Sequence, residues 1–224
     1  MLLWIVALTL AGGLDGKPSS DEVWPSIAVD RTWQEYEVRA DSFDEALREC
    51  RKAGQGGWAG YTKWDLAWNY NFSDFKIETR SLGDKQLLIV RDVKITVTEV
   101  KVKQMTRLPK LIAGEGFSDE DRQAWDVWYT DLREHELAHQ RVSSAAAIET
   151  WLKRRVAGIR YLERTFPAGK QLGDREGQAA IRAELTEIYN HALERIRDKN
   201  EELDQRTAHG RINFRWDEFL RGYF

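Results

Sequence analysis

The pentapeptide HELAH, at residues 135–139, places two histidines four positions apart. On an α-helix, side chains at positions i and i+4 lie on the same face, so the imidazoles of His135 and His139 can bind one metal ion. Glu136 stands between them, where it can take a proton from a metal-bound water. The pattern therefore predicts a helix that carries a Zn²⁺ site, with two histidine ligands and Glu136 as the general base.

The residues around this motif indicate that both histidines face the protein interior. Apolar side chains recur with the helical period of 3.6 on either side of the pair, and the histidines fall on the same stripe. Two titratable rings buried one turn apart without partners would be costly, which favours a bound metal ion over an ordinary pair of core histidines. The apolar members of the stripe are Trp125, Trp128, Leu132, Val142 and Ala146.

A catalytic zinc site needs a third protein ligand and an open position for water. The extended metzincin motif is excluded, because Ala145 stands where its third histidine would be. The remaining candidates lie far downstream and are Glu184, His191 and His209. A carboxylate such as Glu184 would complete the ligand set of thermolysin-like enzymes. The spacing alone leaves these candidates open.

The chain changes its hydrophobic period near its middle, which indicates two structural halves. Alternating residues predict strands between 33 and 105, with a β-bulge near Glu99 where the alternation slips by one residue, and Pro109 is expected to end this half. The period then changes to 3.6, which predicts helices over 118–156 and 174–200. The predicted fold class is α+β, with a small antiparallel or mixed sheet of three to five strands packed on two long helices.

Two serines predict where helices begin. Ser42 is followed three residues later by Glu45, and Ser118 is followed three residues later by Asp121. In a capping box, the serine side chain accepts a hydrogen bond from the backbone N–H of the third helical residue, and the acidic side chain of that residue accepts one from the backbone N–H of the serine. We therefore expect a short helix after Ser42, closed by Gly54, and the motif helix after Ser118.

The first residues are typical of a targeting segment. Residues 1–13 are almost wholly apolar and end in small residues, as in a signal peptide cleaved after Gly13. The apolar run is shorter than the roughly 20 residues that a membrane-spanning helix needs, so no stable membrane span is expected after cleavage. The sequence therefore predicts export to the periplasm or the extracellular space.

The remaining residues divide into a linker and one domain. Residues 14–30 are polar and rich in helix breakers, which predicts a linker. Residues 31–224 are expected to form a single metallopeptidase-like domain with a sheet half over 31–108 and a helical half over 118–203. A last segment, 204–224, contains His209, one of the candidate metal ligands.

Composition excludes several classes of protein. Hydrophobic residues make up 42% of the chain and there are ten tryptophans, so the chain is not globally disordered. The 34 basic and 37 acidic residues leave a net charge of −3, which gives no basic field for nucleic acid. Cys50 is the single cysteine, which excludes an intramolecular disulfide framework and a cysteine-rich zinc module.

Three segments together carry a resemblance to a known family. HELAH at 135–139 follows Thr-Lys-Trp at 62–64 and precedes the sequence DQRTAHG at 204–210. In this order they resemble a bacterial family of secreted zinc-dependent proteases catalogued as domain of unknown function 922. The late motif of that family, Asp-x-x-Thr-x-His-Gly, is matched at Asp204, Thr207, His209 and Gly210. The resemblance covers about residues 33–213.

The resemblance implies a zincin-like fold and selects His209 as the third zinc ligand. Asp204 would then either accept the remaining ring proton of a ligand histidine or cap a turn. Glu184 and His191 remain alternative ligands. The side chain that stabilises the developing negative charge is left open among Tyr129, Tyr189, His191 and Arg206.

The motif and the targeting segment together predict a secreted endopeptidase. Zinc would polarise the scissile carbonyl, while Glu136 would deprotonate the bound water and pass the proton to the leaving amine. The substrate would be a protein or peptide, paired by its backbone with a strand at 87–103. Two alternatives use the same residues: an inactive or structural zinc-binding protein of the cell envelope, and an amidase acting on a peptidoglycan-type crosslink.

Overall fold

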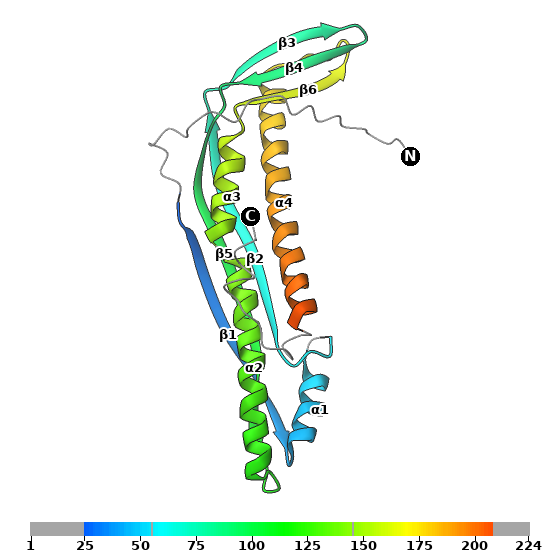
Figure 1. Ribbon diagram of the computed structural model, residues 1–224. Helices are drawn as coiled ribbons and strands as arrows, with labels where there is room; N and C mark the ends of the chain where they lie inside the picture. The colour runs from blue at the N-terminus through cyan, green and yellow to red at the C-terminus, as the bar shows by residue number, and fades with distance from the viewer. Residues whose placement is uncertain (1–24, 55, 145, 208–224) are drawn as a thin grey trace.

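The computed structural model describes residues 25–54, 56–144 and 146–207. Figure 1 shows an elongated molecule in which long strands run beside long helices, with a small sheet at one end. In chain order the elements are β1 (Ile27–Ala40), α1 (Phe43–Ala53), β2 (Tyr61–Ser73), β3 (Lys76–Leu82), β4 (Lys85–Arg91), β5 (Lys94–Ala113), α2 (Asp119–Ser143), α3 (Ala146–Ala157), β6 (Tyr161–Pro167) and α4 (Asp174–Thr207).

The first sheet is mixed and has the strand order β1-β5-β2. Its central strand, β5, is parallel to β1 and antiparallel to β2. Asn69 pairs with Glu99 and Tyr70 with Val97, so Thr98 is an extra residue on β5. The β-bulge predicted near Glu99 is therefore confirmed, because an unpaired residue moves the following side chains to the other face of a strand.

The second sheet is antiparallel and has the order β3-β4-β6. Strand β6 was not expected, since it lies between the helices predicted over 118–156 and 174–200, inside the half that was expected to be helical. Of the seven residues in β6, Leu162 alone is buried. A strand that fully buries so few of its side chains is stabilised by its pairing with β4, which a local pattern does not report. The expected single sheet is therefore two sheets.

The predicted helix over 118–156 is interrupted. The hydroxyl groups of Ser143 and Ser144 both donate to the carbonyl of Gln140, which competes with continuation of the helix. Helix α2 ends at Ser143 and α3 begins at Ala146. In contrast, α4 continues to Thr207, beyond the end expected at residue 200, so Asp204 lies on a helix.

Strand β5 does not end at Pro109, although the sheet half was expected to stop at residue 108. Beyond Arg107, β2 no longer pairs with β5, and β1 is the neighbour that remains. A strand paired on one side uses every second backbone N–H in the ladder, so a proline is tolerated there. The pairing with β1 carries the strand to Ala113.

Strand β1 begins at Ile27, inside the segment predicted as a linker over 14–30. Its first residues pair with β5, from Ile27 opposite Val100 to Asp30 opposite Lys103. Ile27 and Val29 are half-buried and Ala28 and Asp30 are exposed, so this short stretch has no fully buried residue to mark it as a strand. Backbone pairing with the long central strand, rather than burial, extends β1 toward the N-terminus.

The long helices and the first sheet share one core. Figure 1 shows α4 running beside α2 and α3 along the sheet, and α1 at the end far from the second sheet. Members of the main core include Leu66, Val102, Val142, Ile148, Leu185 and Ile188. A second cluster joins α1 to β1 and the first half of α2, with Tyr36, Val38, Ala46, Cys50 and Trp125. The α+β class with a mixed sheet is therefore confirmed.

The predicted helix starts are also confirmed. Ser42 accepts a hydrogen bond from the Glu45 amide and caps α1, and Ser118 forms a capping box with Asp121 at the start of α2. Gly54 follows α1, as expected. Among the residues that the structure describes, no helix combines the length and the apolar composition that a membrane crossing requires.

Candidate metal centre

The two histidines of HELAH lie on the buried face of α2, as predicted. His135 is 6% exposed and His139 is 9% exposed, and the apolar residues Ala138 and Val142 on the same helix are fully buried. The two rings are nearly perpendicular, with centroids 4.6 Å apart. Their Nε2 atoms are separated by 3.1 Å, so both rings direct the same nitrogen toward one point.

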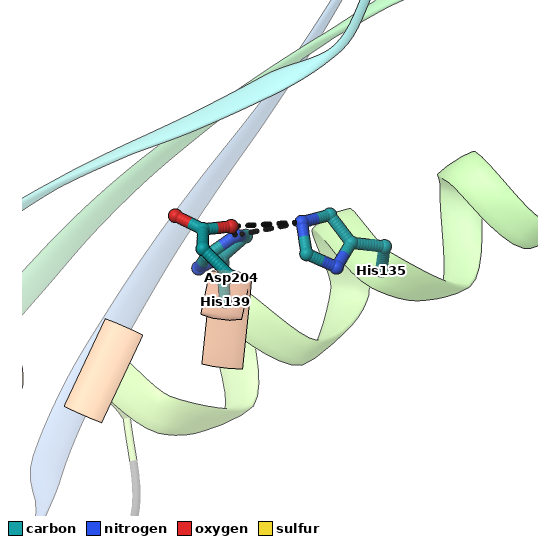
Figure 2. A group of neighbouring side chains, drawn as sticks. All are labelled: His135, His139 and Asp204. Atoms are coloured by element: carbon teal, nitrogen blue, oxygen red, sulfur yellow. Dashed lines mark hydrogen bonds and ion pairs between the residues drawn. The ribbon is translucent and has the colours of Figure 1, made fainter. Parts of the chain in front are cut away.

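Asp204 reaches this point from the last turns of α4. Its Oδ1 atom lies 3.1 Å from Nε2 of His135 and 3.1 Å from Nε2 of His139 (Figure 2). A tetrahedral zinc ion with bonds of 2.0–2.1 Å separates its ligand atoms by about 3.3 Å. The triangle of two nitrogens and one oxygen therefore has nearly the size of one face of a zinc coordination tetrahedron, and the three residues could hold a metal ion.

The Nδ1 atoms of both histidines face α4. Nδ1 of His139 lies 2.7 Å from Oδ1 of Asn200, and Nδ1 of His135 lies 3.2 Å from Oγ1 of Thr207. Asn200, Asp204 and Thr207 are spaced by four and three residues, which places them on one face of the helix. One face of α4 therefore meets both rings of α2.

Donor and acceptor counting indicates which ring nitrogens carry protons. Asn200 donates its amide Nδ2 to the carbonyl of Ile196, so its Oδ1 is the atom left for His139. Thr207 donates its hydroxyl to the carbonyl of Leu203, so its oxygen acts as an acceptor for His135. Both histidines then donate from Nδ1, and both Nε2 lone pairs point at the candidate metal position.

The charges of the centre depend on one another. In the metal-free protein, burial raises the pKa of Asp204, but hydrogen bonds from protonated histidine Nε2 atoms outweigh burial and hold its pKa well below the usual range. Burial lowers the pKa of His139, whereas the hydrogen bond to Asp204 and the charge of Glu136 raise it, and the net shift is upward. Without a metal ion, Asp204 therefore remains an anion that favours a protonated His139.

Glu136 is buried between α2 and the sheet. Its Oε2 atom accepts a hydrogen bond of 2.8 Å from the hydroxyl of Thr62 on β2. The Thr62 hydroxyl lies 2.8 Å from that of Thr106, which in turn accepts from Nε2 of Gln140. Burial raises the pKa of Glu136, and the charge of His139 and the Thr62 hydrogen bond act against burial. A chain of hydrogen bonds from Gln140 through Thr106 and Thr62 therefore holds the Glu136 carboxylate in place.

Gly60, which precedes β2, gives Glu136 its space. A Cβ atom at this position would lie 3.1 Å from Oε1 of Glu136, 3.1 Å from Leu132 and 3.2 Å from Leu108. These distances are tighter than ordinary van der Waals contact, so a larger residue would push the carboxylate. The glycine thus permits the close approach of the 57–60 segment to α2.

The candidate metal centre opens into a groove of about 1040 Å³. Helix α2 lines it from Glu120 to His139, and further lining comes from α1, from residues 57–62 and from Trp64. Asn200 and Asp204 of α4 complete the lining. The groove therefore gives access to His135, Glu136 and His139, which a closed structural site would not need.

Two of the sequence-predicted alternatives lie away from this centre. Glu184 pairs with Arg164 at 2.9 Å. His191 is exposed and lines a smaller pocket beside Trp151. The structure therefore does not bring either residue to the histidine pair. His209 lies outside the described residues, and its role as a ligand stays a prediction.

The candidates for charge stabilisation also lie elsewhere. The hydroxyl of Tyr189 donates to the carbonyl of Leu66, Tyr129 stacks on Trp125, and Arg206 pairs with Glu202. None of these side chains lines the groove. No role was predicted for Asn200, Thr62 or Gly60, although Thr62 belongs to the Thr-Lys-Trp segment of the family resemblance and Asn200 lies four residues before Asp204.

The strands expected to pair with a peptide, at 87–103, are interior strands. Strand β4 lies between β3 and β6, and β5 lies between β1 and β2. Both neighbours of each strand use its backbone groups, so that prediction is wrong. Strand β2, which carries Thr62 beside Glu136, is at an edge of its sheet.

Comparison with known proteins gives one match. Neither the search of curated proteins nor the search of solved structures found a match. The family model described as bacterial protein of unknown function (DUF922) matches residues 33–210, which include the HELAH helix, Asp204 and His209. The model covers well over half of the chain, and the chain therefore belongs to the DUF922 family of bacterial proteins.

Proposed function

We propose that this protein is a zincin-like, zinc-dependent endopeptidase that acts outside the cytoplasm. The observation that carries the proposal is the meeting of Nε2 of His135, Nε2 of His139 and Oδ1 of Asp204 within 3.1 Å of one another. Two nitrogens and one carboxylate oxygen are a ligand set that zinc prefers in catalytic sites. The groove beside these atoms offers room for a substrate.

The ligand residues also fit zinc in their protonation. Asn200 and Thr207 occupy both Nδ1 atoms, which leaves each Nε2 lone pair for a metal ion. Zinc bound there would supply a Lewis acid that polarises a carbonyl and lowers the pKa of a water molecule. If His209 also binds, it would join the same set from the segment that follows α4.

Glu136 is the proton carrier in this proposal. The Thr62 hydroxyl holds Oε2, and Oε1 lies beside Gly60, which lines the groove. Glu136 can therefore accept a proton from the attacking water and return it to the amine of the leaving peptide without a rearrangement of its backbone. The substrate is a protein or peptide, and the apolar residues 1–13 direct the protein to the periplasm or the extracellular space.

The test is a paired measurement of metal content and hydrolysis. The purified chain should contain about one zinc ion and should cleave an unstructured protein such as denatured casein. Chelation should remove both properties, and added zinc should restore both. The Glu136→Gln variant is the control, because it keeps the ligands and loses the proton acceptor.

Two results would contradict the proposal. Protein that stays free of zinc after growth in zinc-rich medium would remove the metal site. Protein that binds zinc and cleaves no polypeptide would reassign the centre to a structural role. Cleavage of a peptidoglycan-type amide in place of polypeptide would support zinc-dependent amide hydrolysis but would replace the proposed polypeptide substrate.

A further inference from the structure

The groove has the length of a polymer site. Its α2 wall runs from Glu120 to His139, which at 1.5 Å per helical residue is about 28 Å. An extended polypeptide advances about 3.3 Å per residue, so roughly eight residues fit along this wall. A single amino acid or a dipeptide would leave most of the groove empty.

One part of the groove presents large apolar side chains to solvent. Trp58 is 46% exposed and Val127 is 61% exposed, and both line the groove. Trp128 also lines the groove, and its ring packs on those of Trp125 at 5.0 Å and Phe43 at 6.5 Å, so the side chains behind it hold it in place. An exposed apolar surface with rigid backing favours a large apolar side chain of a ligand.

The charged residues around this apolar part are mainly acidic. Glu120 and Asp131 on α2 are exposed, and both line the groove. Arg51 of α1 is the one basic residue of the described lining. Glu136 and Asp204 add two carboxylates at the metal centre. A ligand with a basic residue near its apolar side chain therefore matches the charge of the groove.

Two contacts indicate which backbone groups of β2 are available at the sheet edge. Residues of an antiparallel strand alternate between pointing their N–H and C=O groups at the partner strand and pointing them away. The Leu66 carbonyl accepts the hydroxyl of Tyr189 on α4, so it points away from β5. The close approach of the Thr62 and Thr106 hydroxyls is typical of a pair that makes no ladder hydrogen bonds. By this alternation, Thr62 and Trp64 also point their backbone groups outward.

The edge of β2 is covered at one place and opens into the groove at another. Tyr189 occupies the edge at Leu66, and its ring stacks on Trp68. Thr62 and Trp64 line the groove, where their outward backbone groups lie beside the candidate metal centre. A peptide that pairs with an exposed strand edge gains main-chain hydrogen bonds, while its side chains select pockets.

We propose that the groove binds an extended polypeptide as an additional strand on β2 at Thr62 and Trp64, with a large apolar side chain against Trp58 and Val127 and a basic residue beside Asp131. This inference rests on the proposed function and narrows its substrate class to unfolded polypeptide with apolar residues. Trp58 and Val127 become specificity-determining residues, and the β2 backbone sets the register of the substrate.

The experiment measures binding without turnover. Fluorescein-labelled ten-residue peptides bind to zinc-loaded Glu136→Gln protein, and anisotropy gives the dissociation constant. A peptide with a central Phe next to Lys should bind about tenfold more tightly than the same peptide with Ala and Ser at these positions. Methylation of single peptide nitrogens should weaken binding at alternate positions, because a strand pairs through every second residue.

Variants locate the binding surface. Trp58→Ala should remove the preference for Phe, whereas Trp33→Ala should not, because Trp33 is 44% exposed on β1 and does not line the groove. Val127→Asp provides a second variant on the exposed face of α2, and it should also remove the preference. An unchanged preference in both groove variants would overturn the assignment.

The outcomes separate this inference from the proposed function. Peptide binding with alternate sensitivity to methylation, but no hydrolysis by the unmodified protein, would overturn the endopeptidase and keep the groove assignment. Hydrolysis with no dependence on Trp58, Val127 or peptide methylation would overturn the groove assignment and keep the endopeptidase. Tight binding of a soluble N-acetylglucosamine oligosaccharide in place of the peptides would overturn the polypeptide assignment.

Discussion

Replacing Asn200 with leucine tests the inference that α4 orients the metal-binding nitrogens. Oδ1 of Asn200 accepts the Nδ1 proton of His139 at 2.7 Å, and both residues are buried. Leucine has nearly the same volume and cannot accept a hydrogen bond. The variant therefore leaves the Nδ1 proton of His139 without its described acceptor and frees the ring to adopt the other tautomer, in which Nε2 carries the proton.

The size of the effect follows from the lost hydrogen bond. A buried donor left without an acceptor costs about 1–3 kcal/mol. Loss of the partner that orients a metal-binding histidine weakens metal affinity by about 10- to 100-fold, and each tenfold step is about 1.4 kcal/mol. The two estimates agree, so we expect the dissociation constant for zinc to rise by about 10- to 100-fold in Asn200→Leu.

The assay is competition for zinc between the protein and a chromophoric chelator at neutral pH. Asn200→Asp is the matched control, because a carboxylate keeps the acceptor for His139 and should preserve or strengthen zinc binding. Circular dichroism establishes that each variant is folded. Asn200→Leu protein that binds zinc as tightly as the unmodified protein would refute the tautomer argument.

Further predictions concern the ligands, the base and its surroundings. Asp204→Ala should weaken zinc binding more than Asn200→Leu does, and unchanged affinity would show that Asp204 is not a zinc ligand. His209→Ala in the same chelator assay establishes whether His209 is a ligand. Glu136→Gln should keep zinc and lose at least about 99% of peptide hydrolysis, and full activity would exclude Glu136 as the base. Gly60→Ala should lower kcat with little change in zinc affinity, because its Cβ would lie 3.1 Å from Oε1 of Glu136; an unchanged kcat would show that the carboxylate tolerates the contact. Folding raises the pKa of His139 above its unfolded value of about 6.5 and lowers the pKa of Asp204 below its unfolded value of about 3.9. The ion pair should therefore stabilise the metal-free protein most between these two unfolded values. This stabilisation should decline as pH rises through the folded pKa of His139, and also as pH falls through the folded pKa of Asp204. Urea unfolding from pH 5 to 9 should show this alkaline decline without metal, and a decline of equal size in Asp204→Asn would contradict it.

Local sequence patterns predicted the features that one helical turn or one strand decides. The spacing of His135 and His139 places both rings on one face of a helix whatever the rest of the chain does. The capping residue Ser118 marks the start of that helix by contacts within four residues. The phase slip near Glu99 predicted the bulge because side-chain alternation is a property of the strand itself.

Patterns of this kind misjudged the elements that pairing stabilises. Strand β6 has one fully buried residue and the first four residues of β1 have none, and each segment is held by backbone hydrogen bonds to a neighbouring strand. Pro109 was expected to end a strand, but the place where β2 stops pairing makes it acceptable in β5. Which strand lies at an edge is likewise a property of the whole sheet. The strands at 87–103, expected to pair with a peptide, are interior, whereas β2 is an edge strand.

The sequence alone established the two histidines, Glu136 between them and the α+β class, because each depends on periodicity along a short segment. The tertiary structure decided that Asp204 faces the Nε2 atoms, that Asn200 and Thr207 hold the Nδ1 atoms, and that Thr62 holds Glu136. These contacts join residues more than 60 positions apart, and they exist because the packing of α4 and β2 against α2 brings those faces together. Spacing in the chain carries no information on which helix faces meet, so the completed centre was visible only in the folded protein.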